Sequence, residues 1–224
     1  MPPLLPIALW TGCGLVCGVM IGIAMRKREH ETPRLQLITQ VAVTGVLTLA
    51  LAWKQESDLD LSIAVGFIVA AVPLAGLDLR TGKLPNWLVL LTHLLALAGL
   101  ALTMLVQPQT SHLLAALAGV VAFTLLYGGW YALLPGHIGG GDLKLAPAAG
   151  AVLGWHGWPA AANSLPLVAV FQMLVWLAGA LLLIWGLQAI AYVAARAAGH
   201  RPDIALRHGT FLVLGTVVAL LLVP

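Results

Sequence analysis

Charged side chains are scarce in this sequence. The 224 residues include 11 Lys and Arg and 8 Asp and Glu, so 8% of the chain is charged, whereas 61% is hydrophobic. An ordinary soluble domain has roughly 25% charged residues. The shortage excludes a soluble globular protein and predicts an all-α polytopic membrane protein, because a helix satisfies its own backbone polar groups within lipid.

Cysteine and dense clusters of basic residues are also lacking. Cys13 and Cys17 both lie in the first apolar run, and their spacing of four fits neither a disulfide framework nor a Cys-x-x-Cys zinc site. We therefore expect no metal and no other cofactor. The basic residues are spread thinly between apolar runs, which argues against nucleic acid as a partner.

The first run is followed, not preceded, by Arg26-Lys27-Arg28, so we expect a retained span and not a cleaved signal peptide.

Eight apolar segments approach or exceed the roughly 20 residues that cross the hydrocarbon core of a bilayer. Eight spans leave no room for a soluble domain, so we expect one membrane domain over residues 1–224. The sixth segment is short, and the seventh is long enough that its end should tilt or lie along the interface. The segments are Leu5–Met25, Leu35–Trp53, Leu61–Leu77, Trp87–Val106, His112–Leu134, Leu143–Trp158, Ser164–Ala195 and Gly209–Val223.

The basic residues predict the orientation of these spans. Lys54 is the exception among the Lys and Arg residues, because all the others follow odd-numbered spans. Cytoplasmic loops are enriched in Lys and Arg. We therefore expect the odd-numbered loops in the cytoplasm, both termini outside, and a multi-pass protein of the inner (plasma) membrane. Residues 1–60 would form two spans joined by a short basic cytoplasmic loop.

A glycine repeat marks one face of the first span. Gly14, Gly18 and Gly22 recur every four residues, a spacing that lets a neighbouring helix approach closely. Packing within the chain is the favoured interpretation, and a homodimer interface is the alternative.

Two acidic residues lie at membrane boundaries. Six of the eight acids fall in loops, whereas Asp78 ends the third span and Asp142 begins the sixth. Spans four and five form an out-and-back hairpin, so both aspartates return to the same cytoplasmic edge. An ionisable group at such a depth indicates a functional site. Two close carboxylates do not both ionise easily, and such a pair can act as base and acid in peptide hydrolysis.

Other interpretations of these residues stay open at this point. Asp142 could be the N-cap of a helix, and Asp78 could pair with Arg80 or Lys83. The glycines at 139–141 could adopt positive φ and admit an extended substrate beside Asp142, or they could simply form a tight turn. The same two acids could serve as the ion relay of a proton-coupled transporter.

Each boundary aspartate lies in a short motif. The two motifs are Asp78-Leu-Arg-Thr-Gly-Lys-Leu-Pro-Asn and the Gly-x-Gly-Asp stretch Gly139-Gly-Gly-Asp142-Leu-Lys-Leu. They resemble the motifs of the type IV prepilin peptidases. The tail from Asp203 to Gly215 also resembles the closing segment of that family, although the usual Pro-Phe-Gly-Pro is altered. The resemblance covers roughly residues 61–224, which would be a peptidase-like core. A non-catalytic assembly partner of a pilus or secretion machine is a further alternative.

The resemblance implies a membrane aspartyl endopeptidase. Such enzymes remove the short basic leader from type IV prepilins and pseudopilins at the cytoplasmic membrane face, after a glycine and before the apolar segment. By resemblance, Asp78 and Asp142 would be the catalytic pair. The partners would be prepilin-like substrates and the lipid bilayer. The implied substrate-binding residues are Gly139, Gly140, Gly141 and Lys144.

The first loop departs from the pattern of the larger family members. Those proteins carry two Cys-x-x-Cys zinc pairs after the first span, and they also methylate the new N-terminus with S-adenosylmethionine. Here the loop is only Arg26 to Arg34 and contains no cysteine. We therefore expect a peptidase without zinc, and the departure puts methyltransferase activity in doubt.

Overall fold

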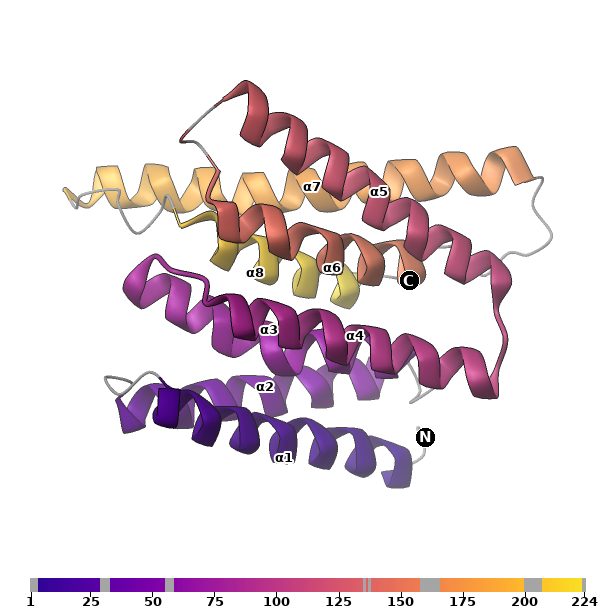
Figure 1. The fold of residues 1–224 in the computed structure, drawn as a ribbon, viewed down its shortest axis with the longest axis horizontal. Helices are drawn as coiled ribbons and strands as arrows, with labels where there is room; N and C mark the ends of the chain where they lie inside the picture. Colours follow the sequence, from indigo (N-terminus) through magenta and orange to yellow (C-terminus); the bar gives the residue numbers. More distant parts are fainter. Residues whose placement is uncertain are drawn as a thin grey trace. The chain divides into compact units, whose positions relative to one another are not determined.

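The computed structural model describes residues 4–28, 33–54, 59–134, 136, 138–157, 166–199 and 207–222. Within these ranges the regular secondary structure is entirely helical, which confirms the predicted all-α class (Figure 1). The eight helices are α1 (Leu4–Arg28), α2 (Arg34–Lys54), α3 (Leu61–Thr81), α4 (Asn86–Val106), α5 (Thr110–Leu133), α6 (Gly140–Gly157), α7 (Pro166–Ala197) and α8 (His208–Leu222).

Six of these helices, α1 to α5 and α7, are long and apolar enough to cross a membrane. The sixth and eighth predicted spans correspond to α6, with 18 residues, and α8, with 15 residues, and neither is among the six. The helices agree with a polytopic membrane protein. The side of the membrane on which the termini lie stays a prediction.

Proline precedes one helix and lies inside another. α4 begins at Asn86 directly after Pro85, whose φ of −62° and ψ of 129° are extended, as expected for the turn into the fourth span. α6 continues through Pro147, and α7 is one continuous helix of 32 residues.

Several predicted features lie outside the described residues: the span ends Trp158, Ser164 and Val223, and the loop acids Glu29, Glu31, Glu56, Asp58 and Asp203.

The chain divides into two compact units. The first comprises residues 1–77 and 85–108, and contains α1, α2, most of α3, and α4. The second comprises residues 78–84 and 109–224, and contains the end of α3 with α5 to α8. The single membrane domain expected from the sequence stays a prediction.

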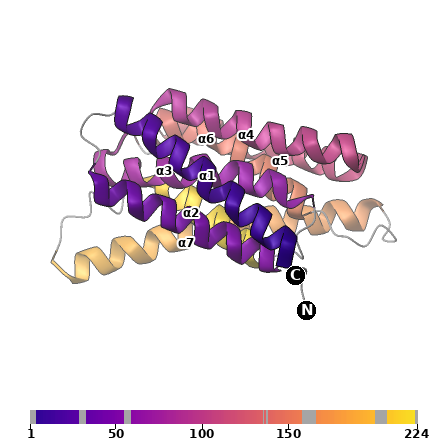
Figure 2. The ribbon, with the colours of Figure 1, turned by 90° about the horizontal axis from the view of Figure 1, so that it is seen from below.

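In the first unit, the glycine repeat of α1 packs against α2, which runs beside it (Figures 1 and 2). A Cβ on Gly14 would lie 2.6 Å from Oγ1 of Thr48, and one on Gly18 would contact Thr44. The hydroxyl of Thr44 donates to Gln40 O and that of Thr48 to Thr44 O, so neither group is buried without a partner. The favoured interpretation of the repeat, packing within the chain, is confirmed.

Polar side chains also join helices within the first unit. Gln36 of α2 donates to Gly76 O of α3 at 3.1 Å, and Ser62 of α3 donates to Gly99 O of α4 at 2.8 Å. α3 is the most buried of the six helices that are long and apolar enough to cross a membrane. Its residues 61–77 belong to the first unit, and Asp78 follows in the last turn of the same helix.

In the second unit, α5 and α6 pack backbone to backbone. Cβ atoms on Gly119 of α5 or Gly150 of α6 would collide with the other helix's carbonyl oxygen, so both positions require glycine at this distance. α8 packs beside α6 and α7 (Figure 1). This packing brings the first residues of α6 and α8 together with residues 78–84.

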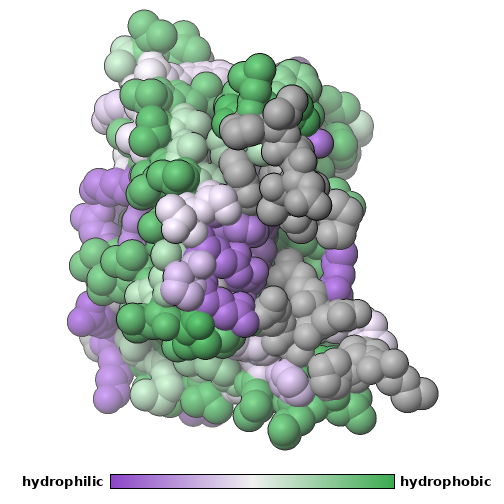
Figure 3. All heavy atoms as spheres, turned by 90° about the vertical axis from the view of Figure 1, so that its right-hand side faces the viewer, coloured by the Kyte–Doolittle hydropathy of each residue, from purple (hydrophilic) through white to green (hydrophobic). Residues whose placement is uncertain are grey.

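Large hydrophobic side chains cover much of the exposed surface. The face in Figure 3 shows many of them in green around a smaller hydrophilic area. Exposed examples are Leu105 at 83%, Leu133 at 80% and Leu167 at 81%. Water-soluble monomers rarely expose contiguous apolar surface on this scale, whereas lipid-facing helices require it.

Candidate active site

Asp78 lies in the last turn of α3 and is 4% exposed. Its Oδ2 accepts two hydrogen bonds from Thr210 of α8, one from the backbone N–H and one from the hydroxyl, each at 2.9 Å. Arg207 donates from Nη1 to the carbonyl oxygens of Asp78, at 3.0 Å, and of Leu79. These carbonyls belong to the last turn of a helix, where a cation is electrostatically favoured. One segment therefore holds both the backbone and the carboxylate of Asp78.

Asp142 is the third residue of α6 and is 6% exposed. Its Oδ2 accepts a hydrogen bond from the backbone N–H of Gly139 at 3.1 Å. Gly139 is the residue before the helix, and its carbonyl accepts the N–H of Leu143, the first bond of the helix. Asp142 thus caps the helix from its third position, as the acid of a capping box does, and not from the N-cap position considered above.

The two carboxylates meet at Gly209 of α8. A Cβ on Gly209 would lie 2.8 Å from Oδ1 of Asp142 and 3.1 Å from Oδ2 of Asp78. The two oxygens are therefore no farther apart than the sum of these distances. The two aspartates lie close together, as the predicted hairpin of spans four and five requires. Asp78, Asp142 and Gly209 all belong to the second unit.

Burial affects the protonation of Asp142. Asp142 precedes the apolar segment that begins at Leu143, and its desolvation raises the pKa of its carboxyl to about 6. The N–H of Gly139 opposes that shift, and the negative charge of Asp78 adds to it. The pair can thus hold one proton in mildly acidic solution, which is the condition for acid and base to act together.

The predicted substrate-binding glycines do not use positive φ. Among the described glycines, positive φ occurs at Gly82, Gly136 and Gly199. The expectation of left-handed backbone at 139–141 is wrong, because this run instead begins a helix. Gly141 instead allows α6 to approach Leu84 closely, because a Cβ on Gly141 would lie 2.7 Å from Cβ of Leu84. A Cβ on Gly140 would meet open space.

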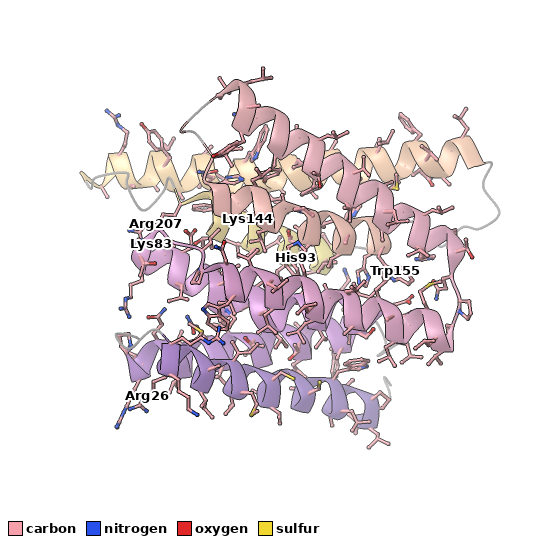
Figure 4. All side chains as sticks on the ribbon, viewed as in Figure 1. Arg26, Lys83, His93, Lys144, Trp155 and Arg207 are labelled. Carbon is pink, nitrogen blue, oxygen red and sulfur yellow. The ribbon has the colours of Figure 1, made fainter. Side chains whose placement is uncertain are left out.

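Lys144 lies two residues after Asp142 and is exposed (Figure 4). Positions two residues apart on a helix do not share a face. Lys144 therefore belongs to the rim of the site, not to the buried space between the carboxylates.

The start of α8 supplies residues that the sequence interpretation did not single out. Gly209 and Thr210 contact the aspartates, and the preceding His208 is hydrogen-bonded through Nε2 to Tyr127 Oη of α5 at 2.8 Å. Nδ1 of His208 is bonded to Oε1 of Gln188 of α7 at 2.6 Å. Burial lowers the pKa of His208 to about 4, so the ring is neutral. A neutral ring donates from one nitrogen and accepts at the other, which ties α8 to two helices.

A sequence signal for these residues exists. His208, Gly209 and Thr210 are small or polar residues at the start of an apolar run, the same boundary criterion that selects Asp78 and Asp142. Figure 4 shows Arg207 and Lys83 together at this end of the second unit, and Arg207 Nε lies 3.7 Å from where a Cβ on Gly82 would be.

The model of the type IV leader peptidase family matches residues 65–187. The match covers more than half of the chain and contains both aspartates. The comparisons with curated proteins and with solved structures gave no match. Membership of the matched family implies peptidase activity, and the apolar helices agree with a multi-pass membrane peptidase. The chain belongs to the type IV leader peptidase family.

Proposed function

We propose that this protein is an aspartyl endopeptidase of the inner membrane that removes the short basic leader from type IV prepilin or pseudopilin-like precursors at the cytoplasmic face. The observation that carries the proposal is the pair of buried carboxylates, Asp78 and Asp142, both of which lie close to Gly209. A buried acidic pair at helix ends is poorly suited to ion transport through the membrane, because transporter sites lie near mid-membrane.

The reaction needs one ionised and one protonated carboxyl. The ionised group takes a proton from a water molecule as the water oxygen attacks the scissile carbonyl carbon. The protonated group donates its proton to the carbonyl oxygen, which gives a neutral tetrahedral intermediate. When the C–N bond breaks, the leaving nitrogen takes the proton held by the first carboxyl, and an intermediate hydroxyl returns its proton to the second. The pair ends in its starting state.

The residues around the pair have separate roles in this proposal. Gly139 and Gly140 are exposed at the start of α6, where an extended substrate segment can approach Asp142 without meeting a side chain. Gly141 sets the distance between α6 and Leu84. Lys144, at the exposed rim, would contact substrate outside the buried space. The mechanism uses no zinc and no methyl donor.

Incubation of the detergent-solubilised protein with a purified prepilin precursor tests the function. Mass spectrometry is expected to find the leader peptide and the shortened pilin, without an added methyl group. Intact precursor after prolonged incubation would oppose the proposal. Substrate flux into proteoliposomes without proteolysis would instead favour the transporter alternative.

Activity is expected to decline as the pH rises above about 6. The pKa of Asp142 is raised by burial to about 6, so the pair keeps its proton below that pH and becomes doubly ionised above it. A doubly ionised pair retains a base and lacks the acid, so kcat/KM should fall by about tenfold for each pH unit on that limb. Initial cleavage rates from pH 4 to pH 9 measure the profile. A rate that continues to rise between pH 6 and pH 9 would contradict this assignment.

A further inference from the structure

Among the described residues, Asp78 and Asp142 accept different hydrogen bonds. Oδ2 of Asp78 accepts both the N–H and the hydroxyl of Thr210, each at 2.9 Å, whereas Asp142 accepts the N–H of Gly139 at 3.1 Å. A backbone N–H can only donate, so Oδ2 of Asp78 is held as an acceptor. Two donors on one oxygen favour the ionised form of a carboxyl group. The asymmetry therefore distinguishes the two members of the pair.

We propose that Thr210 is a positioning residue that holds Asp78 as the ionised, water-activating member of the pair and leaves Asp142 to carry the proton. The inference rests on the proposed peptidase function and deepens it, because it assigns the base and the acid. Burial raises the pKa of Asp142 to about 6, which agrees with its role as the acid.

Other groups near Asp78 have separate hydrogen-bond partners. The guanidinium of Arg207 donates to the backbone carbonyls of Asp78 and Leu79. His208 is neutral and is bonded to Tyr127 and Gln188. The hydroxyl of Thr210 is thus a side-chain donor aimed directly at the carboxylate. The titratable or charged groups on α3 from Asp78 onward, on the segment to Leu84, on α5 and α6, and at the start of α8 include Arg80, Lys83, His112, Tyr127, Tyr131, Asp142, Lys144, His156, Arg207 and His208.

Two substitutions at Thr210 separate the hydroxyl from the rest of the side chain. T210V has nearly the same shape and keeps the backbone N–H, but it removes the hydroxyl donor to Asp78. T210S keeps the hydroxyl and removes one methyl group. T216V is the matched control, because Thr216 is also buried in α8 and its hydroxyl donates to Leu212 O of the same helix at 2.7 Å.

The kinetic experiment measures kcat and KM for cleavage of a purified prepilin precursor across pH for the wild type and these variants. T210V is expected to lower kcat by about 10-fold to 100-fold, the loss typical of a hydrogen bond to a charged group, with little change in KM. Its kcat/KM should fall by a similar factor, because the hydroxyl acts on the catalytic carboxylate and not on substrate binding. T210S should restore both values, and T216V should match the wild type.

Two results would overturn the inference while the peptidase function stands. The first is a T210V profile that superimposes on that of an active wild type. The second is a lower T210V rate that T210S shares, since this indicates a purely structural role. Thermal unfolding and size-exclusion profiles verify the fold of each variant.

A spectroscopic measurement separates this inference from the peptidase function. Infrared difference spectra detect hydrogen bonds to a carboxyl group without substrate. The signal that D78N removes belongs to Asp78, because the other acids are unchanged in that variant. T210V should shift the frequency of this signal, and T216V should not. An unchanged frequency would refute the role of Thr210 even if no precursor were cleaved, whereas failure of the wild type to cleave would refute the proposed function alone.

Discussion

Replacing either Asp78 or Asp142 with Asn is expected to lower precursor cleavage by about 10³-fold or more. An amide has the shape of the carboxyl group, but it can neither take a proton from water nor donate one to the scissile carbonyl, and general acid–base catalysis supplies effects of this size. Quantitative mass spectrometry of leader release over time measures the loss.

The folded structure should survive both substitutions. The Asn side-chain oxygen at 142 can still accept the N–H of Gly139, and the one at 78 can still accept the donors of Thr210. The thermal unfolding midpoint should not fall, because a neutral amide replaces an acid that is costly to bury. D60N, at an aspartate in the first unit, is the control and should cleave like the wild type. Wild-type rates in D78N or D142N would refute the two-aspartate mechanism.

G209A is expected to lower kcat by about 100-fold, although it adds only one methyl group. The new Cβ would meet Oδ1 of Asp142 at 2.8 Å, Cδ1 of Leu84 at 2.8 Å and Oδ2 of Asp78 at 3.1 Å. At least one carboxylate must move, and a misplacement of about 1 Å in a catalytic group costs a factor of this order. Single-turnover cleavage rates measure the effect on the chemical step.

G179A is the matched control for this substitution. Gly179 also lies in a helix of the second unit, but a Cβ there meets open space, and helices accept alanine more readily than glycine. Its rate should be within about twofold of the wild type. Equal rates for G209A, G179A and the wild type would mean that the carboxylates do not depend on the close approach of α8.

The helices follow closely from the sequence. Apolar runs between charged or proline-containing stretches predict α1 as Leu5–Met25, and the helix is Leu4–Arg28. The fourth predicted span begins at Trp87 and α4 begins at Asn86. These agreements arise because burial of apolar side chains and satisfaction of backbone hydrogen bonds act within each segment. The first loop and the tail before Arg207 are not described, so the predictions that fall there stay predictions.

The glycine run at 139–141 shows where local interpretation was wrong. Three consecutive glycines favour a flexible or left-handed backbone, yet two of them form the first turn of α6. The carboxylate of Asp142 reaching back to Gly139, and the packing of α5 on α6, stabilise that turn. Tertiary packing and a cap outweigh the low helix propensity of about 1 kcal/mol per glycine.

By itself, the sequence determined the helical membrane architecture and selected Asp78 and Asp142, because charge is so scarce that each acid at a boundary requires an explanation. Only the tertiary structure decided their surroundings. Thr210 bonds to Asp78 across 132 positions of the chain, and Gly209 lies close to both carboxylates. The physical reason is that the boundary position of a neutral threonine and a glycine does not indicate their partners, which depend on where α8 packs.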